Sequence, residues 1–96
     1  DDGVKVLGEL VSLASLNARL GEFGIIGLVV AKPDPRRGHE LLLVREPGGA
    51  TMDEFNAGLA PVERVSRELC VAELPRSEIG KLDRAKVEAL GLAPDP

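Results

Sequence analysis

Apolar and polar positions at the start of the chain predict a hairpin followed by a helix. Residues 3–12 alternate apolar and polar side chains and resume an apolar run after Gly8-Glu9, which predicts a β-hairpin with a two-residue turn. Residues 12–21 then carry three leucines at helical spacing. With Ser12 as N-cap and Gly21 as the stop, they predict a short amphipathic helix.

The middle of the chain predicts two strands and a second helix. The apolar run at residues 25–31 has no polar face, which is typical of a strand covered on both sides. Turn-forming residues follow it, and a second strand is expected at residues 40–46. Thr51 and Glu54 have the spacing of a capping box and should open a helix that Pro61 ends.

The last third of the chain predicts one more strand and a final helix. Residues 64–74 are mostly apolar but are interrupted by polar residues at 66–68, and we expect them to form the third strand. Cys70 lies in this run and is expected to be a small core residue rather than a nucleophile. The final helix should begin after Asp83, point Val87 and Leu90 inward, and stop at Gly91.

This order of elements predicts an α+β fold. We expect a small three-stranded sheet packed with helices, preceded by an N-terminal two-stranded β-hairpin. The 96 residues are enough for one domain. Within it, residues 1–12 would form the leading segment and hairpin, residues 13–92 the α+β body, and residues 93–96 a frayed tail.

Composition excludes several classes of function. The net charge is −4, and Phe23 and Phe55 are the only aromatic residues, so neither a basic footprint nor stacking platforms for nucleic acid are present. The single cysteine has no partner for a disulfide, and no Cys/His pair has metal-ligand spacing, so we expect a reducing, cytoplasmic setting and no metal site. No apolar run approaches the roughly 18 residues of a membrane span.

The Gly80-Lys81 pair first suggests a phosphate-binding loop, since P-loops end in Gly-Lys ahead of a helix. The P-loop motif also needs a glycine where this chain has Pro75, and a Ser or Thr where it has Leu82. Without that hydroxyl, magnesium would lose a ligand. The sequence therefore argues against a P-loop.

Three segments resemble motifs of the adenylate-forming superfamily, which includes acyl-CoA synthetases, peptide-synthetase adenylation domains and luciferases. PRSEIGKLDR at 75–84 resembles the superfamily's final, lysine-bearing motif. DDGVKVLGELVS at 1–12 is similar to its hinge and hairpin motif, and VVAKPDPRRGHELLLV at 29–44 to its strand-turn-strand. They occur in the expected order and cover nearly the whole chain. The resemblance implies the mobile C-terminal subdomain of such an enzyme.

The resemblance implies a catalytic role for Lys81, whose ammonium would contact the acyl carboxylate and the bridging oxygens of the adenylate. Pro75 and Gly80 would belong to the loop that supports this lysine. Asp1 would be the hinge about which the subdomain rotates between two half-reactions. Gly8 would border the tunnel for the pantetheine thiol.

The turn that carries Arg36, Arg37 and His39 is basic, and its two arginines are candidates to contact CoA phosphates or an acidic carrier protein. His39 follows Gly38 where the superfamily often places a glutamate directly, so the details of this turn differ from the family's pattern.

The implied activity is an AMP-forming carboxylic acid–thiol ligase. ATP and Mg²⁺ would be bound mainly by an N-terminal adenylation domain of the same enzyme, with CoA or a phosphopantetheine acyl carrier protein as the thiol acceptor. This chain alone is then expected to be inactive. A protein acetyltransferase acting on Lys81 is a further implied partner, since acetylation would remove the charge that the chemistry uses. The alternative is a stand-alone, non-catalytic module of the same fold that binds a carrier protein or partner domain.

Overall fold

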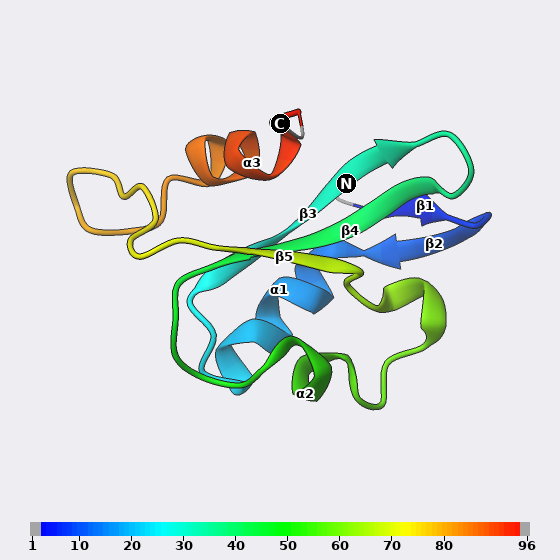
Figure 1. Cartoon of the computed structure of the whole chain (residues 1–96), viewed down its shortest axis with the longest axis horizontal. Coiled ribbons are helices and arrows are strands. Elements are labelled where there is room, and N and C mark those ends of the chain that lie inside the picture. Colours follow the sequence, from blue (N-terminus) through cyan, green and yellow to red (C-terminus); the bar gives the residue numbers. More distant parts are fainter. Residues whose placement is uncertain (1–2, 95–96) are drawn as a thin grey trace.

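A two-stranded hairpin opens the chain in the computed structural model, which describes residues 3–94 (Figure 1). Strands β1 (Gly3–Val6) and β2 (Glu9–Ser12) are antiparallel, with Val6 opposite Glu9. The two turn residues, Leu7 and Gly8, have φ of 51° and 82°. A two-residue turn with positive φ at both positions matches the twist of a hairpin and favours glycine. The predicted hairpin is confirmed.

The main sheet has the strand order β3-β4-β5. Strands β3 (Gly27–Asp34) and β4 (Gly38–Arg45) are antiparallel, whereas β5 (Arg67–Cys70) runs parallel to β4. The third strand was predicted over residues 64–74; it forms inside that range but covers only Arg67–Cys70, so it is shorter than expected and includes part of the polar segment 66–68. As an edge strand β5 is exposed along its whole length, so Cys70 is exposed rather than a core residue.

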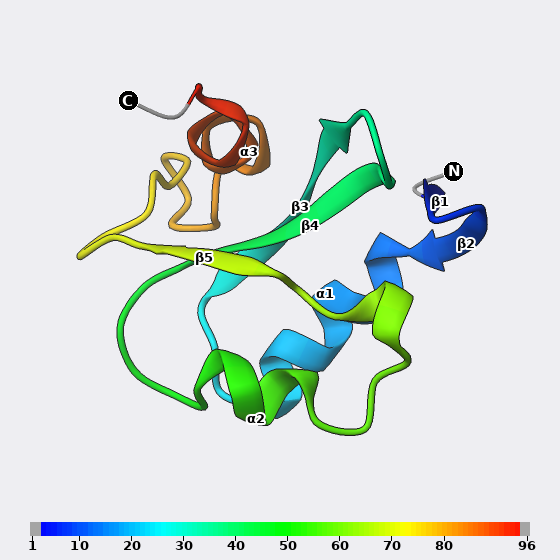
Figure 2. The same ribbon diagram turned by 45° about the vertical axis from the view of Figure 1, so that its right-hand side comes forward.

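Helices cover both faces of this sheet (Figures 1 and 2). On one face lie α1 (Leu13–Glu22), α2 (Met52–Asn56) and the 3-10 turn η1 (Pro61–Glu63), and on the other lies α3 (Arg84–Leu92). Side chains of β3 alternate between two apolar clusters, because Val29 packs towards α1 and α2 while Leu28 and Val30 pack towards α3. The predicted α+β class and the two-sided burial of this strand are confirmed.

The predicted helix starts are confirmed by their caps. The hydroxyl of Ser12 accepts a hydrogen bond from the Ser15 N–H at 3.2 Å, and Thr51 and Glu54 form the reciprocal capping box. The predicted ends were less accurate. Helix α1 continues past Gly21, and α2 ends at Asn56, five residues before Pro61, which instead begins η1.

Helix α3 differs from the prediction at its C-terminal end. Its N-cap is Asp83, as expected, but Gly91 is a buried residue within the helix rather than its stop. A Cβ at Gly91 would lie 3.0 Å from a methyl group of Val44 and 3.2 Å from one of Val30, so the glycine lets the helix approach the sheet closely. Val87 is fully buried, as predicted, whereas Leu90 is 38% exposed.

None of the helices within residues 3–94 is long and apolar enough to cross a membrane.

Candidate functional site

Lys81 lies in a small hairpin loop between β5 and α3, residues 76–82, which we call the Lys81 loop. The Ser77 N–H donates to the Lys81 carbonyl at 2.7 Å, the Gly80 N–H donates to the Ser77 carbonyl at 2.9 Å, and Arg76 bridges to Leu82 outside them. Gly80 has φ of 86°. Three-residue hairpin loops place a residue of left-handed conformation at this position, and glycine adopts it without strain. The predicted importance of Gly80 therefore has a local structural reason.

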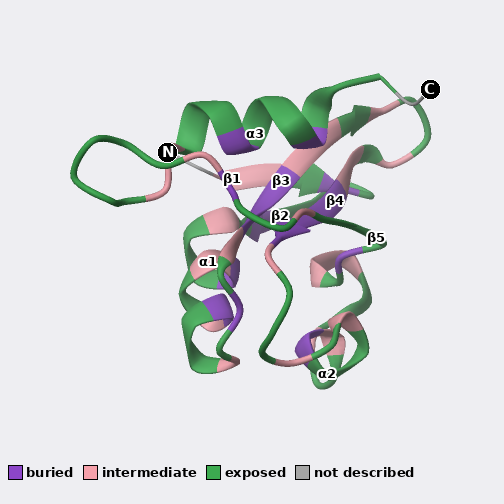
Figure 3. Ribbon diagram, turned by 60° about the vertical axis from the view of Figure 1, so that its left-hand side comes forward, coloured by how far each residue is buried: buried purple, intermediate pink, exposed green. Residues whose placement is uncertain are grey.

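The tip of this loop projects away from the body of the chain (Figures 1 and 3). Lys81 is exposed, and Ile79 beside it has 79% of its surface exposed. Within residues 3–94 the ammonium of Lys81 makes no ion pair and no side-chain hydrogen bond. The ammonium is thus free to bind an anionic group of a ligand or of another protein domain.

The base of the loop is fixed on both sides. The Pro75 carbonyl accepts a hydrogen bond from the Asp83 N–H at 3.0 Å, where α3 begins. On the other side the Glu46 carboxylate accepts from the Leu74 N–H at 2.8 Å and pairs with Arg76 at 3.2 Å. Leu74 itself is buried beneath α3. The lysine is therefore carried by a loop that is anchored at its base and exposed at its tip.

Gly8 lies beside the basic turn between β3 and β4. The Leu7 N–H donates to the Arg37 carbonyl at 2.7 Å, and Nδ1 of His39 is 3.0 Å from the Lys5 carbonyl. Gly38 permits this approach, since a Cβ there would lie 2.9 Å from the same carbonyl. The structure thus brings together the predicted thiol-tunnel glycine and the candidate contact arginines, while a Cβ added at Gly8 would meet open space.

The basic turn is held in place by Asp34. Its carboxylate accepts hydrogen bonds from the backbone N–H groups of Arg37 at 2.8 Å and of Arg36 at 2.9 Å. These bonds, that from Arg37 above all, lower the pKa of Asp34 below its ordinary value. The Arg36 side chain is exposed and that of Arg37 half-buried, so the turn presents cationic groups from a fixed backbone.

Comparison with known proteins gives structural matches without sequence-level ones. No family profile matches the chain, and no curated protein does. An acyl-CoA synthetase (AMP-forming)/AMP-acid ligase II-like protein of Dyadobacter fermentans matches 94% of the chain over 29% of its own length, at 18% identity and a TM-score of 0.73. The amide bond synthetase McbA of Marinactinospora thermotolerans matches 97% over 21%, at 20% identity and a TM-score of 0.76. Mycobacterium smegmatis MbtA matches 90% over 18%, at 26% identity and a TM-score of 0.69.

The chain has the fold of one subdomain of an AMP-forming acyl-CoA synthetase. It spans less than a third of the length of each of these structures. At the level of the fold, this confirms the resemblance to the C-terminal subdomain of the adenylate-forming superfamily.

Within this fold, the loop before α3 that carries Lys81 and the turn of the β1–β2 hairpin that carries Gly8 lie at opposite ends of the molecule (Figures 1 and 2). The Lys81 loop leaves the sheet beside the start of α3, whereas the tip of the β1–β2 hairpin lies next to the β3–β4 turn. The structure does not bring these two predicted sites together. Asp1, the predicted hinge, lies outside the described residues.

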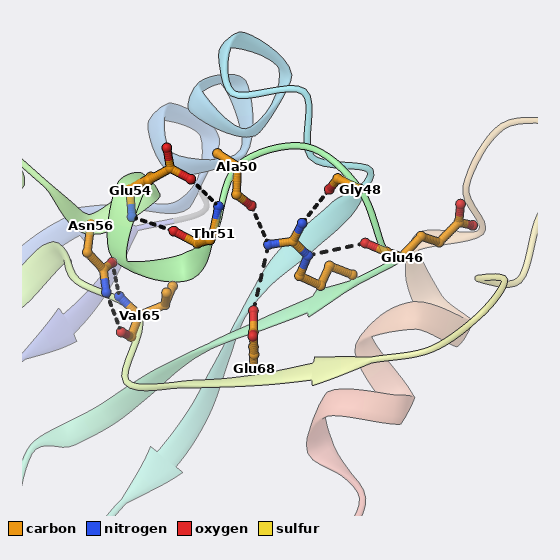
Figure 4. Close-up of polar contacts among 9 residues, drawn as sticks. Glu46, Gly48, Ala50, Thr51, Glu54, Asn56, Val65 and Glu68 are labelled. Atoms are coloured by element: carbon orange, nitrogen blue, oxygen red, sulfur yellow. Dashed lines mark hydrogen bonds and ion pairs between the residues drawn. The ribbon is translucent and has the colours of Figure 1, made fainter.

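Arg45 and Glu46 were not predicted as important from the sequence, but their side chains hold two loops in place: the loop after β4 and the loop before α3. Arg45 is 6% exposed, and its guanidinium donates to the carbonyls of Glu46, Gly48 and Ala50 and lies 3.7 Å from the Glu68 carboxylate (Figure 4). The sequence did contain a signal for them: two charged residues directly follow the four apolar residues 41–44. Charged side chains next to a buried strand seldom lack partners, so a structural role could have been expected.

Proposed function

We propose that this chain is the mobile C-terminal part of an AMP-forming carboxylic acid–thiol ligase, and that it supplies Lys81 to the adenylation step. The observation that carries the proposal is an exposed lysine on an anchored loop of this fold, with no ion pair to any other residue of the segment 3–94. The proposed domain spans residues 1–96, with the hinge at Asp1 and the hairpin in residues 1–12. Its main partner is the N-terminal adenylation domain of the same enzyme, and we propose a cytoplasmic setting.

The first half-reaction brings two anions together. An oxygen of the substrate carboxylate attacks the α-phosphorus of ATP, and the bond from this phosphorus to the oxygen that bridges to the β-phosphate breaks. Pyrophosphate departs, and the acyl-adenylate is the product. A positioned cation relieves the repulsion between the two anions and stabilises charge on the transferring group. Lys81 suits this task because its ammonium is a compact charge on a long, flexible stem.

Residues 3–94 hold no cluster of acidic, His or Cys side chains that would suit a magnesium ion. In the proposed enzyme the N-terminal domain would hold Mg²⁺ and most of the ATP, and the ion would supply neutralisation of phosphate charge. This is also why we expect the chain to be inactive on its own.

The second half-reaction would use the opposite end of the subdomain. The thiol of CoA or of a carrier protein's phosphopantetheine attacks the acyl carbonyl, and AMP leaves. Gly8 would border the path of the thiol arm, while Arg36 and Arg37 beside it would contact phosphates or an acidic carrier surface. The separation of Gly8 from Lys81 supports a rotation of the subdomain between the two steps.

The exposure of Lys81 also supports regulation by a protein acetyltransferase. Acetylation would neutralise the ammonium without breaking a hydrogen bond or ion pair of the loop, since the Lys81 side chain makes none within residues 3–94. Enzyme acetylated at Lys81 should then fail to form the adenylate.

The proposal is tested by replacing Lys81 in the longer enzyme that carries this chain. Lys81→Ala should lower acid-dependent exchange between pyrophosphate and ATP by orders of magnitude, as expected for lost charge stabilisation in the transition state. Lys86→Ala is the matched control, because Lys86 is also exposed and lies on α3 with a single 4.0 Å ion pair to Asp83. Exchange that is equal in the two variants would refute the catalytic assignment.

A further inference from the structure

We propose that Glu46 and Arg76 are positioning residues that set the orientation of the Lys81 loop. This inference rests on the proposed function for its catalytic consequence, but its structural part can be measured independently. Glu46 follows directly after β4 and Arg76 begins the Lys81 loop, so the pair joins the central strand of the sheet to the loop.

One carboxylate oxygen makes both contacts at the base of the loop. Oε2 of Glu46 accepts from the Leu74 N–H at 2.8 Å and from Nη2 of Arg76 at 3.2 Å. Glu46 is itself fixed, because its own N–H donates to the Ile26 carbonyl at 2.9 Å. Its side chain is 13% exposed, so this acceptor is largely shielded from competing water.

The contact extends to the residue that precedes Lys81. Nη1, the second terminal nitrogen of Arg76, donates to the Gly80 carbonyl at 3.3 Å. A planar guanidinium can satisfy two acceptors at once with fixed geometry between them. Arg76 therefore links the Glu46 carboxylate to the peptide group between Gly80 and Lys81.

Among residues 3–94, no other side chain makes a hydrogen bond or ion pair to the tip of this loop, residues 77–81. Its two closing hydrogen bonds, between Ser77 and Gly80 and between Ser77 and Lys81, fix its internal shape. They do not fix its angle to the sheet. That angle is set at the base, and Arg76 is the side chain that ties base and tip together.

A positioning role predicts a pattern that a purely structural role does not. The Arg76 side chain is 35% exposed, and without it the Glu46 carboxylate still accepts a hydrogen bond from the Leu74 N–H, so we expect loss of the Arg76 cation to cost little stability. Loss of the pair should therefore leave the fold intact while loosening the loop. In the enzyme, kcat for adenylation should fall because the catalytic lysine is misplaced. KM for ATP should stay unchanged, because the N-terminal domain is proposed to bind most of the ATP.

The first experiment measures the order of the loop in the 96-residue chain itself. Backbone ¹⁵N relaxation is compared for Glu46→Gln, which keeps side-chain size, and for Arg76→Met, which leaves the Leu74 contact in place. Glu73→Gln and Arg84→Met are matched controls, as both residues are exposed and close in sequence. The order parameters of Gly80 and Lys81 should fall in the two test variants alone. Order parameters equal to those of the controls would overturn the inference.

The second experiment uses pyrophosphate exchange in the longer enzyme. Both test variants should lose about 10- to 100-fold in kcat, and the double variant should be no slower than the slower single one, because both remove the same linkage. If Lys81→Ala abolishes exchange but the test variants keep wild-type kcat, the positioning inference fails and the proposed function stands. If Lys81→Ala itself keeps wild-type exchange, the proposed function fails, and the relaxation result decides the structural link alone.

Discussion

Replacement of Arg45 by methionine tests how the loop after β4 is held. The guanidinium of Arg45 is buried and surrounded by backbone carbonyls of residues 46–50, at 2.7 Å from that of Ala50 and 3.2 Å from that of Glu46 (Figure 4). Methionine fills a similar volume and cannot donate. The variant therefore removes the cation and leaves its acceptors in place.

The expected loss follows from these contacts. Hydrogen bonds to a charged group contribute about 1.5–3 kcal/mol each, and Arg45 donates three to carbonyls. The cost of burying the cation disappears with it, and the exposed Gly48 carbonyl can turn to water, so the full sum is not lost. We expect Arg45→Met to lower the free energy of unfolding by about 3 kcal/mol, a large part of the stability of a small domain.

Urea unfolding followed by far-UV circular dichroism is the assay, since the sequence has no Trp or Tyr for fluorescence. Arg64→Met is the matched control, because Arg64 is exposed and donates one hydrogen bond, to the Leu59 carbonyl at 3.0 Å. Arg45→Lys should be intermediate, as one ammonium cannot span the same acceptors. A loss for Arg45→Met no larger than for Arg64→Met would refute the reasoning.

Three further predictions concern the core, the sheet edge and the hairpin. Phe55→Ala should cost about 3–5 kcal/mol in urea unfolding, because Phe55 is fully buried and its ring packs edge-on against that of Phe23. Hydrogen bonding from Ser66 lowers the pKa of Glu40, so Glu40→Gln should lose stability at neutral pH and lose less at a pH low enough to protonate this carboxylate in the folded state as well. Gly8→Leu should slow transfer of the acyl group to the thiol and spare adenylation, because its turn lies at the opposite end of the molecule from the loop that carries Lys81; the added Cβ meets open space, although its φ of +82° is strained for leucine.

Each of these three has an outcome that would contradict it. Phe55→Leu keeps most of the apolar volume, and a loss equal to that of Phe55→Ala would mean that packing at this site does not matter. A Glu40→Gln effect that is the same at both pH values would exclude a contribution from the ionised carboxylate. Equal loss of both half-reactions in Gly8→Leu would indicate misfolding caused by positive φ at this turn.

Local signals in the sequence were sufficient for the hairpin and the helix starts. Ser12, Thr51 and Asp83 each satisfy a backbone N–H three residues later, and such contacts depend only on the neighbouring sequence. The alternation between two apolar clusters along β3 is equally local, because successive side chains of a strand point to opposite faces.

Features that depend on tertiary packing were not predictable in this way. Gly91 has the residue type of a helix stop, yet it lies within α3 because Val30 and Val44 of the sheet leave no room for a side chain. Strand β5 begins at two charged residues, Arg67 and Glu68, because β4 offers them an edge, and that pairing joins segments far apart in the sequence. The link from Glu46 to Arg76 spans 30 residues, so only the folded chain reveals it. Lys81 itself was identified from its motif, while its anchored loop was not.

The central claim is most directly tested by separating the two half-reactions in a Lys81→Ala variant of the longer enzyme. Acid-dependent pyrophosphate exchange reports adenylate formation, and supplying the finished acyl-adenylate with the thiol reports the second step alone. The account predicts that exchange falls by orders of magnitude while the thioester still forms from the supplied adenylate at close to the wild-type rate. Wild-type exchange in this variant would contradict it.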